Sequence, residues 1–133
     1  MNAEELLYAK THEWVAVETN EAGEKIATVG VSAFAVEALT DLVHIELPEV
    51  GRTVSAAEAF GEVESVKAVS DMYAPVSGEV VAVNDALPDS LESLSDDPYG
   101  RGWVAKIKMT DEAELSQLMD HAAYQQQCAE EDA

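Results

Sequence analysis

Short segments in which apolar and polar residues alternate are the feature that most constrains the fold of this 133-residue chain. In "LVHIEL", the side chains of Val43, Ile45 and Leu47 share one face, whereas His44 and Glu46 lie on the other. A period of two over so few residues is typical of half-buried β-strands, and the enrichment in Val and Ile suits strands as well. Four further segments predict strands in the same way: "EWVAVE" (13–18), "KIATVGV" (25–31), "GEVVAVN" (78–84) and "WVAKIKM" (103–109).

Turn-forming residues separate these segments. The clearest is "DPYG", in which Asp97, Pro98 and Gly100 occupy the positions that a type I turn favours. Several short strands at this spacing predict a β-sandwich or barrel. The length suits one domain, so we expect a single domain over residues 1–133, with a frayed end at about 128–133.

Two helices are expected between the strands. "SAFAVEAL" (32–39) predicts a short helix with Ser32 as its N-cap. "DEAELSQLMDHAAYQQ" (111–126) predicts a longer one, because Asp111 and Glu114 have the spacing of a capping box, with Asp in place of Ser or Thr. The longer helix would pack on the core through an apolar stripe formed by Leu115, Leu118, Met119 and Ala122.

The charge of the chain restricts its partners. It has 27 Asp and Glu against 7 Lys and Arg, a formal net charge of −20. Nucleic acid and anionic membranes are excluded, because phosphate binding needs clustered basic residues. A hydrophobic content of 47% argues against disorder. The acidic surface fits two interpretations: solubility, for instance in a saline cytoplasm, or electrostatic steering toward partners with basic entrances.

Motifs for catalysis, metal binding and targeting are missing from the sequence. Cys128 is the only cysteine, which excludes an intramolecular disulfide and a thiol-rich metal site. There is no glycine-rich phosphate loop, nucleophile elbow or paired metal-ligand spacing, and the three histidines fall on different predicted elements. The start lacks a signal or transit pattern, and no apolar run has membrane-spanning length. We expect a non-enzymatic protein of the bacterial cytoplasm.

One lysine stands out. Lys67 is the only basic residue between Arg52 and Arg101, an interval that contains ten carboxylates. It lies at or near the reversal of a predicted hairpin that lacks the Asn-Gly or Gly pair favoured by tight turns. Most such lysines are simply solvated. The small residues near Lys67, however, leave its amine accessible to the active site of another protein.

The segment around Lys67 resembles a known family. "GEVESVKAVSDMYAPVSGEVVAVN" (61–84) is closely similar to the lipoyl-attachment segment of the glycine cleavage system H protein family. Similar segments of that family match the rest of the chain in order, so that the resemblance covers essentially all of it. They are "YAKTHEWV" (8–15), "VHIELPEVG" (43–51), "SDDPYGRGWVAKIK" (95–108) and the pattern "EL..LMD..AY" (114–124).

The resemblance implies a fold and a function. The fold would be mainly β, a barrel-sandwich hybrid of the lipoyl-domain type, with a short internal helix and a C-terminal helix. The chain would be a monomeric carrier without catalytic activity, bearing lipoic acid in amide linkage on Lys67. Glu13 and Asp71 would border a shelter for the loaded arm and could hold its ammonium group.

The resemblance also implies four partners. A pyridoxal-phosphate glycine decarboxylase would load the aminomethyl group of glycine onto the arm. A tetrahydrofolate-dependent aminomethyltransferase would unload it, and dihydrolipoamide dehydrogenase would reoxidise the arm. A lipoylating enzyme would attach the lipoyl group.

Differences from the family and several alternatives remain. Ala33 and Thr40 stand where the family commonly has an acidic residue and a glycine, in or after the short helix. Val66 and Ala68 flank Lys67, whereas biotin carriers flank the lysine with methionines. Lipoyl domains of 2-oxoacid dehydrogenases are usually shorter and lack the "HEWV" element and the last helix. The sequence leaves open a relay that passes acyl groups to other carriers, and an acidic binding module without modification.

Overall fold

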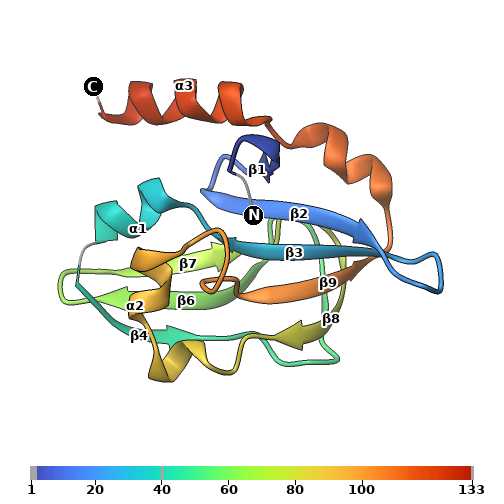
Figure 1. The fold of residues 1–133 in the computed structure, drawn as a ribbon, viewed down its shortest axis with the longest axis horizontal. Coiled ribbons are helices and arrows are strands. Elements are labelled where there is room, and N and C mark those ends of the chain that lie inside the picture. Colours follow the sequence, from blue (N-terminus) through green and yellow to red (C-terminus); the bar gives the residue numbers. More distant parts are fainter. Residues whose placement is uncertain (1–2, 40, 133) are drawn as a thin grey trace.

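The computed structural model describes residues 3–39 and 41–132, and within these residues the strands form two antiparallel sheets (Figure 1). The larger sheet has the order β1 (Leu7–Tyr8), β2 (Glu13–Thr19), β3 (Lys25–Val31), β9 (Ala105–Met109), β8 (Gly78–Val83) and β5 (Thr53–Val54). The smaller sheet has the order β4 (Leu42–Glu46), β6 (Ala59–Ser65) and β7 (Val69–Tyr73). The prediction of a mainly β fold is confirmed.

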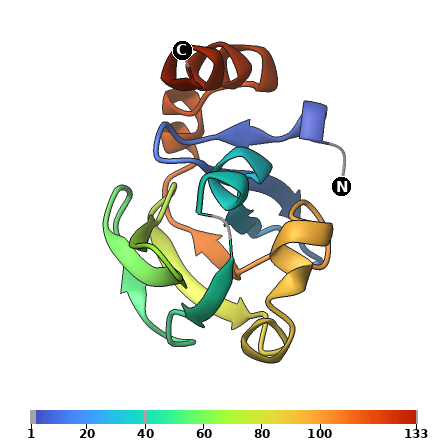
Figure 2. The same ribbon diagram turned by 90° about the vertical axis from the view of Figure 1, so that its left-hand side faces the viewer.

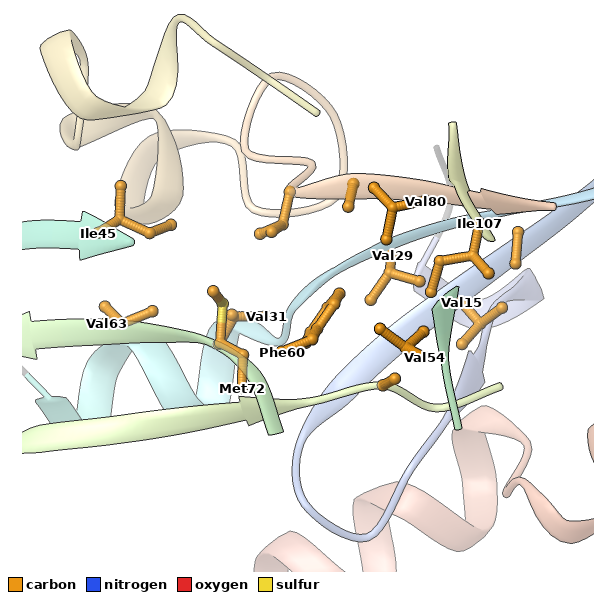
Figure 3. Packing of buried hydrophobic residues seen from close by; sticks show 14 of the residues in the cluster. Val15, Val29, Val31, Ile45, Val54, Phe60, Val63, Met72, Val80 and Ile107 are labelled. Atoms are coloured by element: carbon orange, nitrogen blue, oxygen red, sulfur yellow. The ribbon is translucent and has the colours of Figure 1, made fainter. Parts of the chain in front are cut away.

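The two sheets share one apolar core (Figure 3). Val15 and Val29, which pair across β2 and β3, point into it from the larger sheet. Ile45, Val63 and Met72 enter from the smaller sheet, and all five side chains are buried. Each such side chain stabilises the fold by roughly 1.5–3 kcal/mol relative to exposure. The alternation seen in the sequence therefore corresponds to an inner face on both sheets. The exception is Val43, predicted to share the inner face with Ile45, which is 50% exposed because the pairing of β4 with β6 shifts register between Leu42 and His44.

Short helices connect the strands. The first is α1 (Ala33–Leu39), at whose start the Ser32 hydroxyl accepts a hydrogen bond from the Ala35 N–H at 3.3 Å. This confirms the predicted N-cap. Three further short helices were not predicted: the 3₁₀ helices η1 (Ala3–Glu5) and η2 (Leu87–Asp89), and α2 (Glu92–Asp96). No helix among the described residues is long and apolar enough to cross a membrane.

The single helix predicted over residues 111–126 is wrong. The chain forms a 3₁₀ helix, η3 (Glu112–Gln117), then becomes extended, and then forms α3 (His121–Asp132). The break arises because Met119 exchanges two backbone hydrogen bonds of 2.8 Å with Tyr8 of β1. Asp111 does cap η3, but the Glu114 carboxylate accepts hydrogen bonds from Ser77 and leaves the capping box open.

The side chains that α3 buries differ from those that the sequence predicts. Ala122 is exposed, and the buried side chains are those of Tyr124 and Cys128. The helix ends at Asp132, and the fraying expected at about 128–133 stays a prediction. Figures 1 and 2 show α3 lying outside both sheets, above β1. A second buried cluster, of Leu6, Tyr8, Trp14, Tyr124 and Cys128, lies beneath it.

Candidate functional site

Lys67 lies at the tip of the hairpin formed by β6 and β7 (Figure 1). The strands pair as far as Glu64 opposite Val69, and the Ser65 N–H donates to the Ala68 carbonyl at 2.8 Å. Val66 and Lys67 are the two residues in the middle of this turn, and both side chains are exposed. The primary amine of Lys67 is therefore presented to solvent on a projecting turn.

The hydroxyl of Ser65 holds this turn in place of a glycine. It accepts hydrogen bonds from the N–H groups of Lys67, at 3.3 Å, and Ala68, at 3.1 Å, and donates to the Ala68 carbonyl at 3.2 Å. Such local side-chain bonds replace the turn chemistry that Asn-Gly would supply. The Val66 N–H also donates to the Asp41 carbonyl at 3.1 Å, which ties the tip to the segment before β4. Sequence reasoning missed Ser65, although a serine two residues before the lysine was a usable signal.

We expect the Ser65→Ala substitution to lower the free energy of unfolding by about 1–2 kcal/mol, because it leaves two backbone N–H groups of the turn without their acceptor. Urea unfolding would measure this loss, and amide hydrogen exchange would localise it to Lys67 and Ala68. Ser70→Ala is the matched control, since the exposed Ser70 hydroxyl makes no hydrogen bond within the described part of the chain. Equal effects of the two substitutions would show that the hydroxyl of Ser65 does not fix the turn.

A cavity of about 230 Å³, called here the Glu13 pocket, begins at Ser70 on β7, three residues along the chain from Lys67. Apolar side chains form about half of its wall, and three carboxylates, a histidine, Thr11 and Ser70 complete it. Three residues span at most about 10 Å, so a medium-length acyl chain on Lys67 can reach the pocket. The apolar wall includes Val31, Phe34, Leu39, Val63 and Met72, and the charged or titratable side chains are His12, Glu13, Asp71 and Glu131.

Glu13 is the buried carboxyl group of this pocket. Its exposed fraction is 3%, and it accepts hydrogen bonds from the Thr11 hydroxyl and, at 3.2 Å, from the Tyr73 N–H. It takes part in none of the ion pairs formed by the described residues. Burial raises the pKa of Glu13 from 4.5 to about 7, although both hydrogen bonds act in the opposite direction. Near neutral pH this site can therefore take up either a proton or a cationic group.

The other side chains that the sequence singles out are placed as follows. Asp71 is exposed on β7 and lines the same pocket, so the structure brings it together with Glu13. The roles of both residues toward an arm stay a prediction. Ala33 opens α1, and its N–H donates to the Tyr99 hydroxyl at 3.1 Å, whereas Thr40 lies outside the described residues.

Sequence reasoning missed two titratable side chains of the pocket. One is His12, which lies beside Glu13 in "YAKTHEWV". The other is Glu131, near the C-terminal end of α3. His12 could have been identified because it is adjacent to Glu13 in the sequence, whereas no sequence signal places Glu131 near the pocket.

Comparisons with known proteins agree with this architecture. The family model described as "Glycine cleavage H-protein" matches residues 6–131. The glycine cleavage system H protein of Rhodopirellula baltica is 60% identical over 126 residues, which cover 94% of this chain and 93% of that protein. The protein of the same name from Thermotoga maritima is 48% identical over 124 residues, covering 93% of this chain and 96% of that protein.

A solved structure gives the same answer for the fold. The crystal structure of a glycine cleavage system H protein from Mycobacterium marinum has a TM-score of 0.81 and 41% sequence identity. The match covers 96% of this chain and 98% of that one, which confirms the predicted barrel-sandwich fold with a short internal helix and a C-terminal helix. By sequence and by structure, the chain belongs to the glycine cleavage H-protein family.

Proposed function

We propose that this chain is the lipoyl-bearing carrier of a glycine cleavage system, with Lys67 as the attachment residue. The observation that carries the proposal is the placement of an exposed amine, on a turn held by Ser65, next to the Glu13 pocket. The pocket fits such an arm chemically. Its apolar wall suits an acyl chain and a dithiolane ring, and the carboxylates of Glu13 and Asp71 suit a cationic amine.

The residues of the chain divide the work between attachment and shelter. Lys67 contributes its Nζ atom to an amide bond and loses its positive charge. When bound, the lipoyl group supplies a disulfide that can accept an aminomethyl group. The ammonium of that group would bind to Glu13. A cation close to the buried Glu13 carboxyl lowers the pKa of that carboxyl and favours the carboxylate, which attracts the ammonium. Phe34 and Leu39 of α1 shield the arm from water.

The proposed partners are those of the system that the family is named for. A pyridoxal-phosphate glycine decarboxylase loads the arm, and a tetrahydrofolate-dependent aminomethyltransferase unloads it. Dihydrolipoamide dehydrogenase reoxidises it, and a lipoylating enzyme attaches it, while the chain itself catalyses none of these steps. The net charge of −20 supports steering toward partners with basic entrances, so raising the ionic strength should slow docking.

Intact-mass and peptide mass spectrometry test the proposal on protein from cells supplied with lipoate. We expect one lipoyl group, on the peptide that contains Lys67. A Lys10→Arg variant serves as a control and should be modified equally, because the Lys10 side chain is exposed and far along the chain from the turn. Absence of the modification, while another carrier in the same cells is lipoylated, would contradict the proposal.

A further inference from the structure

The helix α3 is attached to the rest of the molecule by one narrow stripe. The stripe consists of His121, whose ring lies 6.0 Å from that of Tyr8, and of Tyr124, Gln127, Cys128 and Glu131, and the spacing of three and four residues places them on one face. Tyr124 and Cys128 are buried, and the Gln127 amide donates to the Lys10 carbonyl at 2.8 Å. A 12-residue helix has little stability of its own, so these few contacts decide whether α3 is docked.

Among the residues of the stripe, Tyr124 contacts three residues outside α3: Tyr8, His12 and Ser32. Its ring stacks on Tyr8, with centroids 4.4 Å apart and planes 2° from parallel. Its hydroxyl lies 2.7 Å from His12 Nδ1 and also hydrogen-bonds Ser32, the N-cap of α1. Burial raises the pKa of Tyr124 well above its usual range, so the hydroxyl keeps its proton. One buried hydroxyl thus joins α3 to the start of β2 and to α1.

The ring of His12 is held by α3 through both of its nitrogens. Nδ1 contacts Tyr124, and Nε2 lies 3.2 Å from the Glu131 carboxylate. The ring stacks on Phe34 of α1, with centroids 5.2 Å apart. His12 also has a φ of 80°, a region that few residues other than glycine adopt, so its backbone conformation depends on the contacts around it. His12, Phe34 and Glu131 all line the Glu13 pocket.

We propose that α3 is the closing wall of the Glu13 pocket, and that Tyr124 and Glu131 are positioning residues that hold the His12 ring against Phe34. The buried side chains of α3 belong to the smaller cluster that they form with Leu6, Tyr8 and Trp14, and not to the main core between the two sheets. The wall itself follows from the contacts in this chain. That it shelters an amine-bearing arm rests on the proposed function.

Titration of Glu13 in the unmodified full-length chain tests the wall directly. Carboxyl ¹³C NMR would follow Glu13, which is faced in the pocket by His12, Asp71 and Glu131. Tyr124→Phe and Tyr124→Ala leave all of these charges in place. We expect the Glu13 midpoint, raised by burial to about 7, to fall slightly in Tyr124→Phe and by about one pH unit or more in Tyr124→Ala.

Gln126→Ala is the matched control, because this exposed side chain lies on the same helix but outside the docking stripe, and it should leave the midpoint unchanged. Amide hydrogen exchange would report whether α3 is docked in each variant. An unchanged Glu13 midpoint in a chain whose α3 has undocked would overturn the proposal, and so would an α3 that stays docked in Tyr124→Ala. If Tyr124→Ala does not fold, the test rests on Tyr124→Phe. A Glu13 titration midpoint in Tyr124→Phe identical to that of the wild type would then contradict the proposal that α3 closes the pocket.

Glu131 is tested separately, with Glu130→Gln as a control that removes the same charge from an exposed neighbour. We expect Glu131→Gln to weaken the NMR cross-relaxation between the His12 and Phe34 rings, and Glu130→Gln to leave it unchanged. Equal effects of the two variants would contradict a positioning role for Glu131.

A last measurement uses the lipoylated chain with an aminomethyl group on the arm. Spontaneous loss of the amine should be about tenfold faster in Tyr124→Ala than in the wild type or in Gln126→Ala. Equal rates would refute the shelter. If Lys67 carries no lipoyl group at all, the proposed function fails, while the Glu13 titration still decides whether α3 is the wall.

Discussion

Replacing Lys67 by arginine is expected to abolish acylation of this chain completely and to leave its free energy of unfolding unchanged. Arginine keeps the positive charge, but its guanidinium group stays protonated and offers no amine to acylate. The fold should tolerate the change, because the Lys67 side chain is exposed and the turn is held by Ser65 and by backbone hydrogen bonds. Incubation with a lipoylating enzyme, followed by intact-mass spectrometry, measures the first effect, and urea unfolding measures the second.

The same variant separates the interpretations that the sequence leaves open. In a reconstituted glycine cleavage system, Lys67→Arg should reduce turnover to the level seen without the chain, whereas Lys10→Arg should retain full turnover. Activity of the Lys67→Arg chain would point instead to an acidic binding module that needs no modification. A lipoylated wild-type chain that fails in this system but passes its acyl group to another carrier would indicate a relay.

Replacing Glu13 by glutamine is expected to stabilise the chain at pH 8 by up to about 3 kcal/mol. A carboxyl group whose pKa rises from 4.5 to about 7 on folding contributes most to stability below pH 4.5. This contribution is lost as the pH rises through 7, because the buried carboxylate must then ionise without a cationic partner. Glutamine is neutral at every pH, so the difference between wild type and variant should close below about pH 4.5.

Denaturant unfolding of both chains between pH 4 and 8 measures this difference while cancelling the pH dependence of the remaining carboxylates. Asp71→Asn is the control, because it removes a carboxylate from the same pocket but at an exposed position. Its effect on the free energy of unfolding at pH 8 should be smaller than that of Glu13→Gln, because Asp71 is exposed. A Glu13→Gln chain no more stable than the wild type at pH 8 would mean that Glu13 is not a desolvated acid. A buried Glu13 carboxylate that lowers the stability of the fold near neutral pH is consistent with a functional role for this residue.

The sequence predicted the strands well because their signal is local. In 105–109, the alternation itself reports which side chains face a core, whereas in 42–47 it holds for Ile45 but not for Val43, which lies at a register shift and is exposed. It failed for 111–126, where the decisive interactions come from far along the chain. Met119 bonds to Tyr8, and Glu114 bonds to Ser77, and neither contact leaves a trace in the local pattern.

The candidate site shows the same division. Lys67 stood out as the one base in an acidic interval, and the hairpin around it followed from the flanking strands. Glu13 and Asp71 were named only through the resemblance to the family. The contact of Glu131 with His12 joins residues 119 positions apart, which no single-sequence pattern could bring together.

The hydrogen bonds of the Lys67 turn have a mechanical consequence for the proposed carrier. Ser65 and the bond from Val66 to Asp41 fix the attachment point relative to the smaller sheet, so that Lys67 acts as a stationary pivot. The volume swept by an acyl arm is then set by the length of the arm and not by loop motion. A flexible, glycine-rich loop at this position would let the same arm sample a larger volume and would lower the effective concentration of its reactive end. The rigid turn keeps the effective concentration of the arm high, both for the Glu13 pocket and for the active site of a docked partner.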